Sequence, residues 1–234
     1  MTSPPAKLLA HRRPAWAPVL SPAGGSLSHF GGLPLLGPGV EWPVCPLSER
    51  PMTLFLQLLG DDLPGGCGAV AKGHLLQVFY TPDADAALRG EAWKAFSPAH
   101  HVRVVAADGL APAEPAPRSR NFPVKAIAGW EALDDFPMIE ELTDHLGVEV
   151  TFREMGEFEN NGWLARKGDK LGGWPAWANG AAYPRNPATG ERLEPVFQIA
   201  SRGGVPFMFG DLGTAHVFRV PGRSDGWTLS WSGG

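Results

Sequence analysis

Side chains that could do chemistry are sparse in this chain of 234 residues, and one pair has a familiar spacing. Glu141 and His145 stand four residues apart in a segment that is predicted to be helical, so both lie on one face. A carboxylate and an imidazole at this spacing could supply two ligands of a metal ion. Because the sequence assigns no third or fourth ligand, a histidine favoured by the dipole at the end of the helix is the simpler interpretation.

Two glutamines within apolar segments are a second feature. Gln57 and Gln198 have apolar neighbours on both sides in the sequence. A buried amide without a hydrogen-bond partner costs about 1–3 kcal/mol, so each must meet a partner. We interpret them as internal ties that bond to backbone across an approximate twofold axis. The alternative is that they line a shared ligand groove.

Aromatic residues beside glycine- and proline-rich turns form the third group. Trp42, Trp174, Trp177 and Tyr183 all flank such turns. Aromatic side chains on loops of this kind commonly anchor the loop to the core, which is one interpretation. The other is a concave aromatic surface that binds a sugar, a peptide or a loop of a partner protein.

The enzymatic alternative is a hydrolase that uses carboxylate and histidine side chains, with or without a metal. Its candidates are Asp211, His216, Glu141 and His145, although Asp211 is also typical of a turn that precedes a strand. The sequence contains no Gly-x-Ser-x-Gly, P-loop or His-Glu-x-x-His pattern. Cys67 lies in a glycine-rich segment without a charged neighbour that would activate a thiol. We therefore expect a binding protein rather than an enzyme, with no cofactor and no metal.

The charge balance disfavours nucleic-acid and membrane partners. Lys and Arg number 20 and Asp and Glu 24, a formal net charge of −4, so the chain has no general attraction to phosphate backbones or anionic lipids. Residues 14–40 carry no charge, but their prolines and glycines exclude a spanning helix. Two cysteines cannot build a disulfide framework. We expect a cytoplasmic protein whose partner is another protein or a small molecule.

The elements that must position these side chains are mostly short strands. Helices are predicted at 6–13 and 137–146, and Thr81-Pro82-Asp83 could open another. Residues 111–117 read as an extended connector, and Glu154, Glu157 and Glu159 as a solvated acidic face. The predicted fold class is α+β, a β-rich single domain with few peripheral helices. The predicted strands are 54–59, 74–80, 102–106, 124–127, 196–200, 214–220 and 227–231.

A repeat relates two parts of the chain. Residues 31–57 align without gaps on residues 172–198, and the identities include both Gly-Gly-x-Pro turns and both central glutamines. This predicts an internal duplication of a turn-plus-strand unit, with halves at about 29–80 and 170–220. The connecting region is 81–169, and a strand at 227–231 completes a single domain over 1–234. Each copy would cover the apolar face and the strand edge that the other leaves exposed.

The same motifs, in the same order, resemble the YwqG-like family, also called DUF1963. The resemblance runs from about residue 29 to Trp231 and implies a bacterial protein of unknown function, with no catalytic residues to carry over. The motifs are Phe30-Gly31-Gly32-Leu33-Pro34, Trp42-Pro43, Thr53 to Leu58, Gly73 to Tyr80, Lys170 to Trp177, Phe197-Gln198-Ile199 and Gly210 to Gly213. We predict a binding or interaction module with an aromatic and glutamine-lined surface between the two halves. Its tentative ligand-binding residues are Trp42, Gln57, Trp174, Trp177, Tyr183, Gln198 and Asp211.

Overall fold

A ten-stranded sheet dominates the structure, a computed structural model that describes residues 3–22, 26–65, 67–82 and 92–233. The strands are β1 (Arg13–Ser21), β2 (His29–Phe30), β3 (Leu35–Leu36), β4 (Thr53–Leu59), β5 (His74–Tyr80), β6 (His100–Ala106), β7 (Ala111–Pro112), β8 (Lys125–Asp135), β9 (Lys170–Gly172), β10 (Glu194–Ala200), β11 (Thr214–Arg219) and β12 (Trp227–Ser232). The sheet has the order β12-β11-β10-β9-β1-β8-β2-β4-β5-β6, and its neighbours are antiparallel. β3 and β7 form a separate small sheet.

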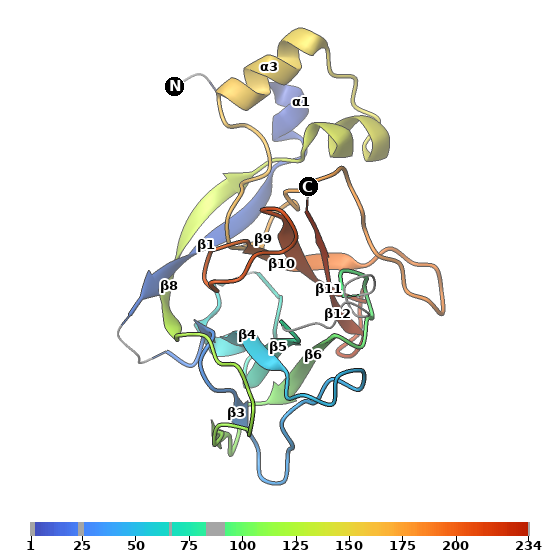
Figure 1. Ribbon diagram of the computed structural model, residues 1–234. Helices are drawn as coiled ribbons and strands as arrows, with labels where there is room; N and C mark the ends of the chain where they lie inside the picture. The colour runs from blue at the N-terminus through green and yellow to red at the C-terminus, as the bar shows by residue number, and fades with distance from the viewer. Residues whose placement is uncertain (1–2, 23–25, 66, 83–91, 234) are drawn as a thin grey trace.

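The large sheet curves into a nearly closed barrel in which the edge strands β6 and β12 approach each other (Figure 1). The backbone N–H of Trp231 donates to the carbonyl of Trp93 at 3.1 Å. The N–H of Phe96 donates to Oγ1 of Thr228 at 2.6 Å. These bonds occupy groups of the β12 edge that would otherwise be open to another chain.

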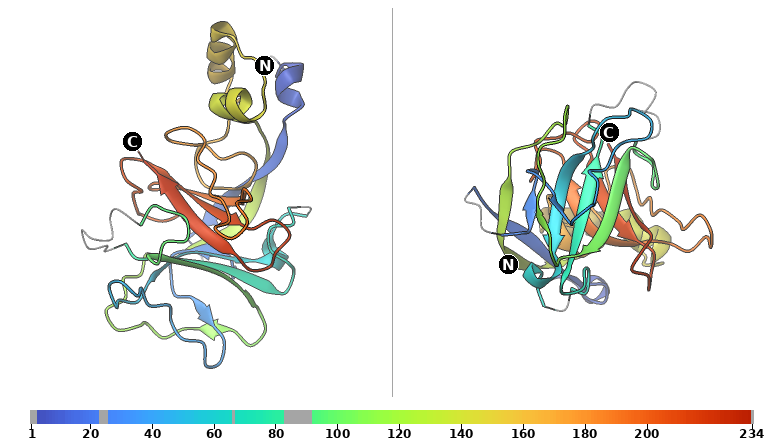
Figure 2. Two further views of the ribbon diagram at one scale, coloured as in Figure 1. Left: turned by 90° about the vertical axis from the view of Figure 1, so that its right-hand side faces the viewer. Right: turned by 90° about the horizontal axis from the view of Figure 1, so that it is seen from below.

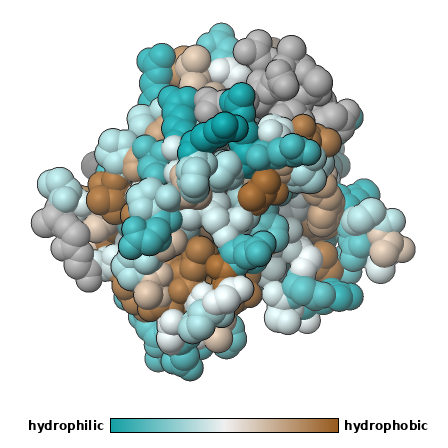
Figure 3. All heavy atoms as spheres, turned by 60° about the horizontal axis from the view of Figure 1, so that its bottom comes forward, coloured by the Kyte–Doolittle hydropathy of each residue, from teal (hydrophilic) through white to brown (hydrophobic). Residues whose placement is uncertain are grey.

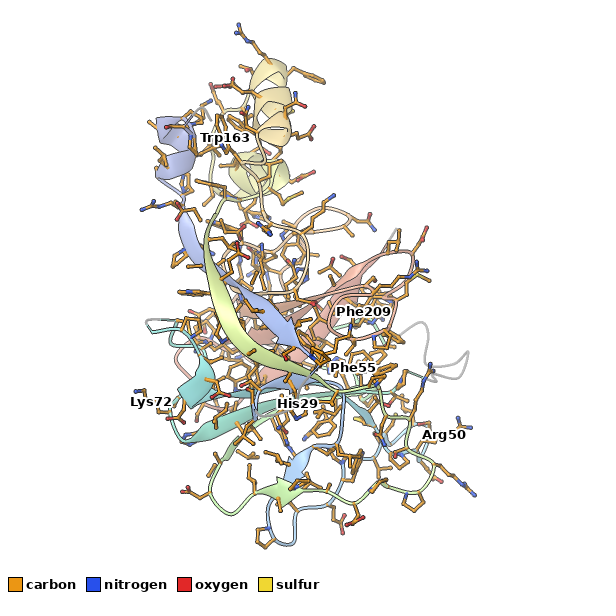
Figure 4. All side chains as sticks on the ribbon, turned by 90° about the vertical axis from the view of Figure 1, so that its left-hand side faces the viewer. His29, Arg50, Phe55, Lys72, Trp163 and Phe209 are labelled. Carbon is orange, nitrogen blue, oxygen red and sulfur yellow. The ribbon has the colours of Figure 1, made fainter. Side chains whose placement is uncertain are left out.

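Aromatic side chains fill the barrel. Phe55 and Phe209 lie inside it, with ring centroids 6.0 Å apart (Figure 4). Phe55 also packs on Tyr80, and Phe209 on Phe207, at 5.3 and 5.0 Å. Because Phe55 belongs to β4 and Phe209 precedes β11, this cluster joins the two ends of the sheet through the interior.

Short helices form a cap at one end of the barrel (Figure 2). They are α1 (Ala6–Leu9), a π-helical turn η2 (Glu141–His145) and α3 (Phe152–Asn160), while a 3₁₀ turn η1 (Gly60–Asp62) follows β4. The cap has a small apolar cluster of its own, formed by Leu8, Phe136, Leu142, Phe158 and Trp163. The end of the molecule that carries β3 shows apolar side chains between hydrophilic ones (Figure 3).

The helices differ from the prediction in three ways. The helix expected at 6–13 ends at Leu9, because Arg13 already belongs to β1. The helix expected at 137–146 is present over residues 139–145, and its last five residues, Glu141–His145, form the π-helical turn η2. The acidic residues interpreted as a solvated face lie on α3, which begins with a capping box between Thr151 and Glu154. The helix that Thr81-Pro82-Asp83 could open falls beyond Pro82, outside the described residues.

The seven predicted strands are present, one of them is longer than predicted, and five strands were not predicted: β1, β2, β3, β7 and β9. The segment 124–127 is the start of β8, which continues to Asp135. β1 was missed because it contains Pro14 and Pro18. β8 pairs along the whole of β1, whereas β9 pairs only with Ala15 and Trp16, so one side of β1 needs few backbone donors. The connector 111–117 is partly ordered, since its first two residues form β7.

Several contacts recur at the spacing of 141 residues that the sequence repeat predicts. Gly31, Gly32, Gly172 and Gly173 all have positive φ, as the paired-glycine turns require. Isolated bridges join Val44 to Pro51 and Arg185 to Arg192, and the irregularity in β4 at Leu54/Leu56 matches that in β10 at Pro195/Phe197. The internal duplication itself stays a prediction, which these local correspondences support.

Within the described ranges, no helix has the length and apolar character needed to cross a membrane.

Candidate functional site

An open cleft of about 720 Å³ lies where the helical cap meets the sheet. Arg13 at the start of β1 and Glu141 in η2 line it. Trp174, which follows β9, contributes an indole ring, and Tyr183 and Arg192 reach the cleft from the loop before β10. These five side chains therefore come from three segments that are distant in the sequence: the start of β1, η2 and the connection between β9 and β10.

A buried ion pair positions Trp174. Asp135 and Lys170 are almost completely buried, and their side chains meet at 2.7 Å. The Asp135 carboxylate also accepts the backbone N–H groups of Trp174 and Arg166, both at 2.7 Å. Gly173 precedes Trp174 at φ +71°, and a Cβ there would overlap the Asp135 carboxylate. The glycine thus lets the turn come close enough to fix Trp174.

Arg13 stacks on the indole of Trp174, with its guanidinium carbon 3.3 Å from the ring centroid. This cation–π contact holds the side chain along the cleft wall. Burial lowers the pKa of Arg13 from its usual value, while the nearby Tyr183 and Glu141 oppose that shift. No ion pair neutralises Arg13 among the residues that the structure describes. Its positive charge therefore remains available in the cleft.

Arg192, Tyr183 and Glu141 form the opposite part of the site. The Arg192 guanidinium lies 3.1 Å from the ring centroid of Tyr183 and donates to Oε1 of Glu141 at 2.8 Å. Glu141 is 1% exposed. Its Oε2 and the Tyr183 hydroxyl are buried and make no hydrogen bond within the described ranges. Burial, followed by the Glu141 carboxylate, raises the pKa of Tyr183, so the phenol keeps its proton.

These groups can bind a polar molecule from two directions. Arg13 offers positive charge to an anionic group. Oε2 of Glu141 offers an acceptor to an N–H or O–H group, and the Tyr183 hydroxyl offers a donor. An arginine without an ion-pair partner therefore lies in the same cleft as an almost completely buried glutamate whose Oε2 has spare hydrogen-bonding capacity.

The predicted ligand contact of the two glutamines is wrong, because both side chains are inside the protein. Gln57 is 0% and Gln198 2% exposed. Oε1 of Gln57 accepts the N–H of Leu35, and its Nε2 donates to the carbonyl of Leu27. Oε1 of Gln198 accepts the N–H of Ala176. Each amide thus ties loops within its own half, and the expected bonds across the axis are not formed.

The other predicted ligand residues are spread over the molecule. Trp42 donates its indole N–H to the carbonyl of Met52 at 2.7 Å and lines a separate hollow of about 420 Å³. Trp177 is buried and lines a third pocket together with His216. Asp211 is exposed in a turn and lines none of these three spaces. Only Trp174 and Tyr183 of the predicted set share the large cleft.

The residues named for a hydrolase are likewise not assembled. Glu141 lies in the cleft, His216 lies in the third pocket, and Asp211 is exposed. His145 contacts Tyr183 edge to face, with ring centroids 6.2 Å apart. Within the part of the chain that the structure describes, no group of three or more His, Cys, Asp or Glu side chains could hold a metal ion.

Arg13 and Arg192, two of the three arginines that line the cleft, were missed at the sequence level. Arg13 was assigned to the last turn of a helix, where a basic residue is ordinary. Arg192 aligns with Pro51 in the repeat, so the alignment carried no signal for it. Only the stacking of each guanidinium on an aromatic ring reveals its role, and that contact depends on the fold.

The fold and the cleft define a β-rich, barrel-like protein with an open cleft at the edge of a helical cap. The chain belongs to the family described as a domain of unknown function, DUF1963, whose match covers residues 28–220. This match confirms the resemblance seen in the motifs. A comparison with curated proteins gives no match.

Proposed function

We propose that the protein binds a small polar molecule in the cleft, and that this molecule carries both an anionic group and an N–H donor. Free amino acids and short peptides, with a carboxylate and an amine or amide, have this chemistry. The observation that carries the proposal is the pairing of an un-neutralised Arg13 with the unbonded Oε2 of Glu141 in one cleft.

The electrostatics of the cleft support a ligand with charges of both signs. Arg192 is already paired with Glu141, so a purely anionic ligand would gain Arg13 but would approach the Glu141 carboxylate. A purely cationic ligand would instead be repelled by the positive charge of Arg13. A ligand with both groups avoids these repulsions and satisfies both side chains.

The size of the cleft agrees with this class of ligand. Sites for small molecules usually measure about 300–1,000 Å³. The proposal includes a cytoplasmic location in a bacterium and a partner that is a small molecule or another protein. It includes no nucleic-acid or membrane partner. The two free cysteines support the cytoplasmic location.

Calorimetric titration with a panel of amino acids, dipeptides, simple carboxylates and simple amines tests the proposal. We expect binding by members with both groups and little heat from carboxylates or amines alone. Replacing Arg13 by Gln removes the charge and keeps a polar side chain. It should weaken binding by about tenfold or more, since hydrogen bonds to charged groups contribute about 1.5–3 kcal/mol.

Arg12 provides the matched control. It is the neighbouring arginine, is exposed and pairs with Asp134 at 3.2 Å, and it does not line the cleft. Arg12→Gln should leave the affinity unchanged. Equal affinity of Arg13→Gln and the wild type, or no binding across the whole panel, would rule the proposal out.

A further inference from the structure

The third pocket, which is separate from the cleft, is lined by residues that have buried polar atoms without partners. It measures about 230 Å³, and its walls are mainly apolar. His216, Trp177 and Ser232 line it, and each has one polar atom of interest: Nδ1, Nε1 and Oγ, respectively. Within the described ranges, each of these three atoms is buried and makes no hydrogen bond. Buried polar atoms are normally bonded, so three in one pocket require an explanation.

The protonation of His216 follows from its other partner. Gln198 donates from Nε2 to the carbonyl of Gly168 at 2.6 Å and accepts the N–H of Ala176 at Oε1, which fixes the orientation of its amide. Nε2 of His216 lies 3.2 Å from the same Oε1. That oxygen can only accept, so Nε2 must carry the proton. Nδ1 of His216 is then unprotonated and is a hydrogen-bond acceptor without a partner.

The imidazole is neutral at ordinary pH. Burial, and then the positive charge of Lys170, lower the pKa of His216 to about 3. The pocket therefore offers a neutral acceptor at His216, a donor at the indole N–H of Trp177 and a hydroxyl at Ser232. No charged side chain presents one of these unbonded atoms.

The first half of the chain shows why the second half has this space. Gln77 pairs with Gln57 across two strands as His216 pairs with Gln198. Arg103 of β6, which lies opposite Gln77, donates to Oε1 of Gln77 at 2.9 Å. On the other side, the residue opposite His216 is Ser230. Because serine is far shorter than arginine, the polar group at this position stays unbonded and a pocket remains.

We infer that this pocket binds a small, flat, uncharged heterocycle that has an adjacent hydrogen-bond donor and acceptor. The donor would bond to Nδ1 of His216, and the acceptor would receive the indole N–H of Trp177. Trp93 and Trp231 supply apolar faces to the ring system. The volume lies below the roughly 300 Å³ at which sites for drug-sized ligands begin, so one or two fused rings fit.

Nuclear magnetic resonance of the whole protein tests this inference. Indazole and 7-azaindole serve as probes, because each is uncharged near pH 7 and presents a ring N–H and an acceptor ring nitrogen on the same edge. Indene, the hydrocarbon of the same shape, is the comparison ligand. The indole N–H signal of Trp177 is identified by its loss in Trp177→Phe. We expect the two heterocycles to shift this signal and indene to bind at least tenfold more weakly.

Two variants and one control complete the test. Trp177→Phe keeps a ring and removes the donor, so we expect about a tenfold loss of affinity for indazole. Ser230→Arg introduces the residue type found opposite Gln77 and should abolish binding. Trp174 lies in the cleft, where its indole N–H donates to the carbonyl of His11. The control variant Trp174→Phe should therefore leave the affinity for indazole unchanged.

Three results would overturn the inference: an unmoved Trp177 signal with both heterocycles at millimolar concentration, equal affinity in Trp177→Phe, or equal binding of indene. A two-dimensional spectrum of each variant shows whether it is folded, and either variant alone suffices for the comparison. The inference does not rest on the cleft, so Arg13→Gln should bind indazole like the wild type.

Discussion

Hydrogen-bond partners decide what each polar residue of this protein can do. Asp135 accepts three donors in the interior and thereby fixes a turn. The side-chain amides of Gln57 and Gln198 form hydrogen bonds with loop backbone. Glu141 is buried and Tyr183 is half-buried, yet each retains a buried oxygen without a hydrogen bond, and both residues line the cleft. Residues of the first kind hold the fold, whereas those of the second kind can recognise a ligand.

The lowered pKa of His216 predicts that the free energy of unfolding depends on pH. Its folded-state pKa of about 3 lies below the ordinary value of 6.5, so between these values only the unfolded chain binds a proton. The contribution to stability is therefore constant above pH 6.5 and is lost as the pH falls toward 3. By pH 5 the loss amounts to about 2 kcal/mol. Urea unfolding at pH 7 and pH 5 measures it.

The matched variant is His216→Gln, which introduces the residue found at the corresponding position, Gln77. We expect the wild type to lose about 2 kcal/mol more than this variant between pH 7 and pH 5. Subtracting the two curves removes the effect of His29 and His100, whose pKa values are also lowered by burial. Parallel curves would contradict the neutral state assigned to His216.

Among the elements, the cap depends on its helix ends more than on its size. α3 has nine residues and buries only Phe158 completely. Its first turn is closed by the capping box of Thr151 and Glu154, and Glu154 also pairs with Lys7 at 2.7 Å. A short helix is marginal by itself, so these contacts and the small apolar cluster must hold the cap beside the cleft.

Thr151→Ala should loosen the cap. The variant loses the side-chain oxygen that accepts the N–H of Glu154, and such caps contribute about 1 kcal/mol. We expect a lower melting temperature and faster amide exchange in α3. Thr151→Ser retains the hydroxyl and should behave like the wild type. If both variants exchange at the wild-type rate, the capping box does not stabilise the cap.

For the whole molecule, one continuous sheet and one central aromatic cluster imply a single cooperative unit. β1 and β8 join the two sides of the sheet along nine residue pairs. Phe209 contacts Phe55 and Tyr80 of one side and Trp231 of the other. The seam between β6 and β12 closes the remaining edge.

Phe209→Ala should therefore destabilise both sides together. Removing a fully buried phenylalanine costs about 3–5 kcal/mol. We expect tryptophan fluorescence and far-ultraviolet circular dichroism to report one transition at the same, lowered urea concentration. Phe152→Ala, at a side chain that is 93% exposed, is the control and should not move the midpoint. Separate transitions of the two probes would show that the halves unfold independently.

The sequence alone determined seven of the strands, the paired-glycine turns and the family, because these depend on local pattern: alternating or continuous apolar runs, glycines with positive φ and motifs in a fixed order. It did not determine β1, whose prolines are acceptable only because β9 pairs with a short part of it. Nor could it assign the glutamines, since burial is a property of the packed barrel. The cleft and the small pocket join residues from distant segments, so only the tertiary structure could bring Arg13 to Trp174 and leave Nδ1 of His216 without a partner.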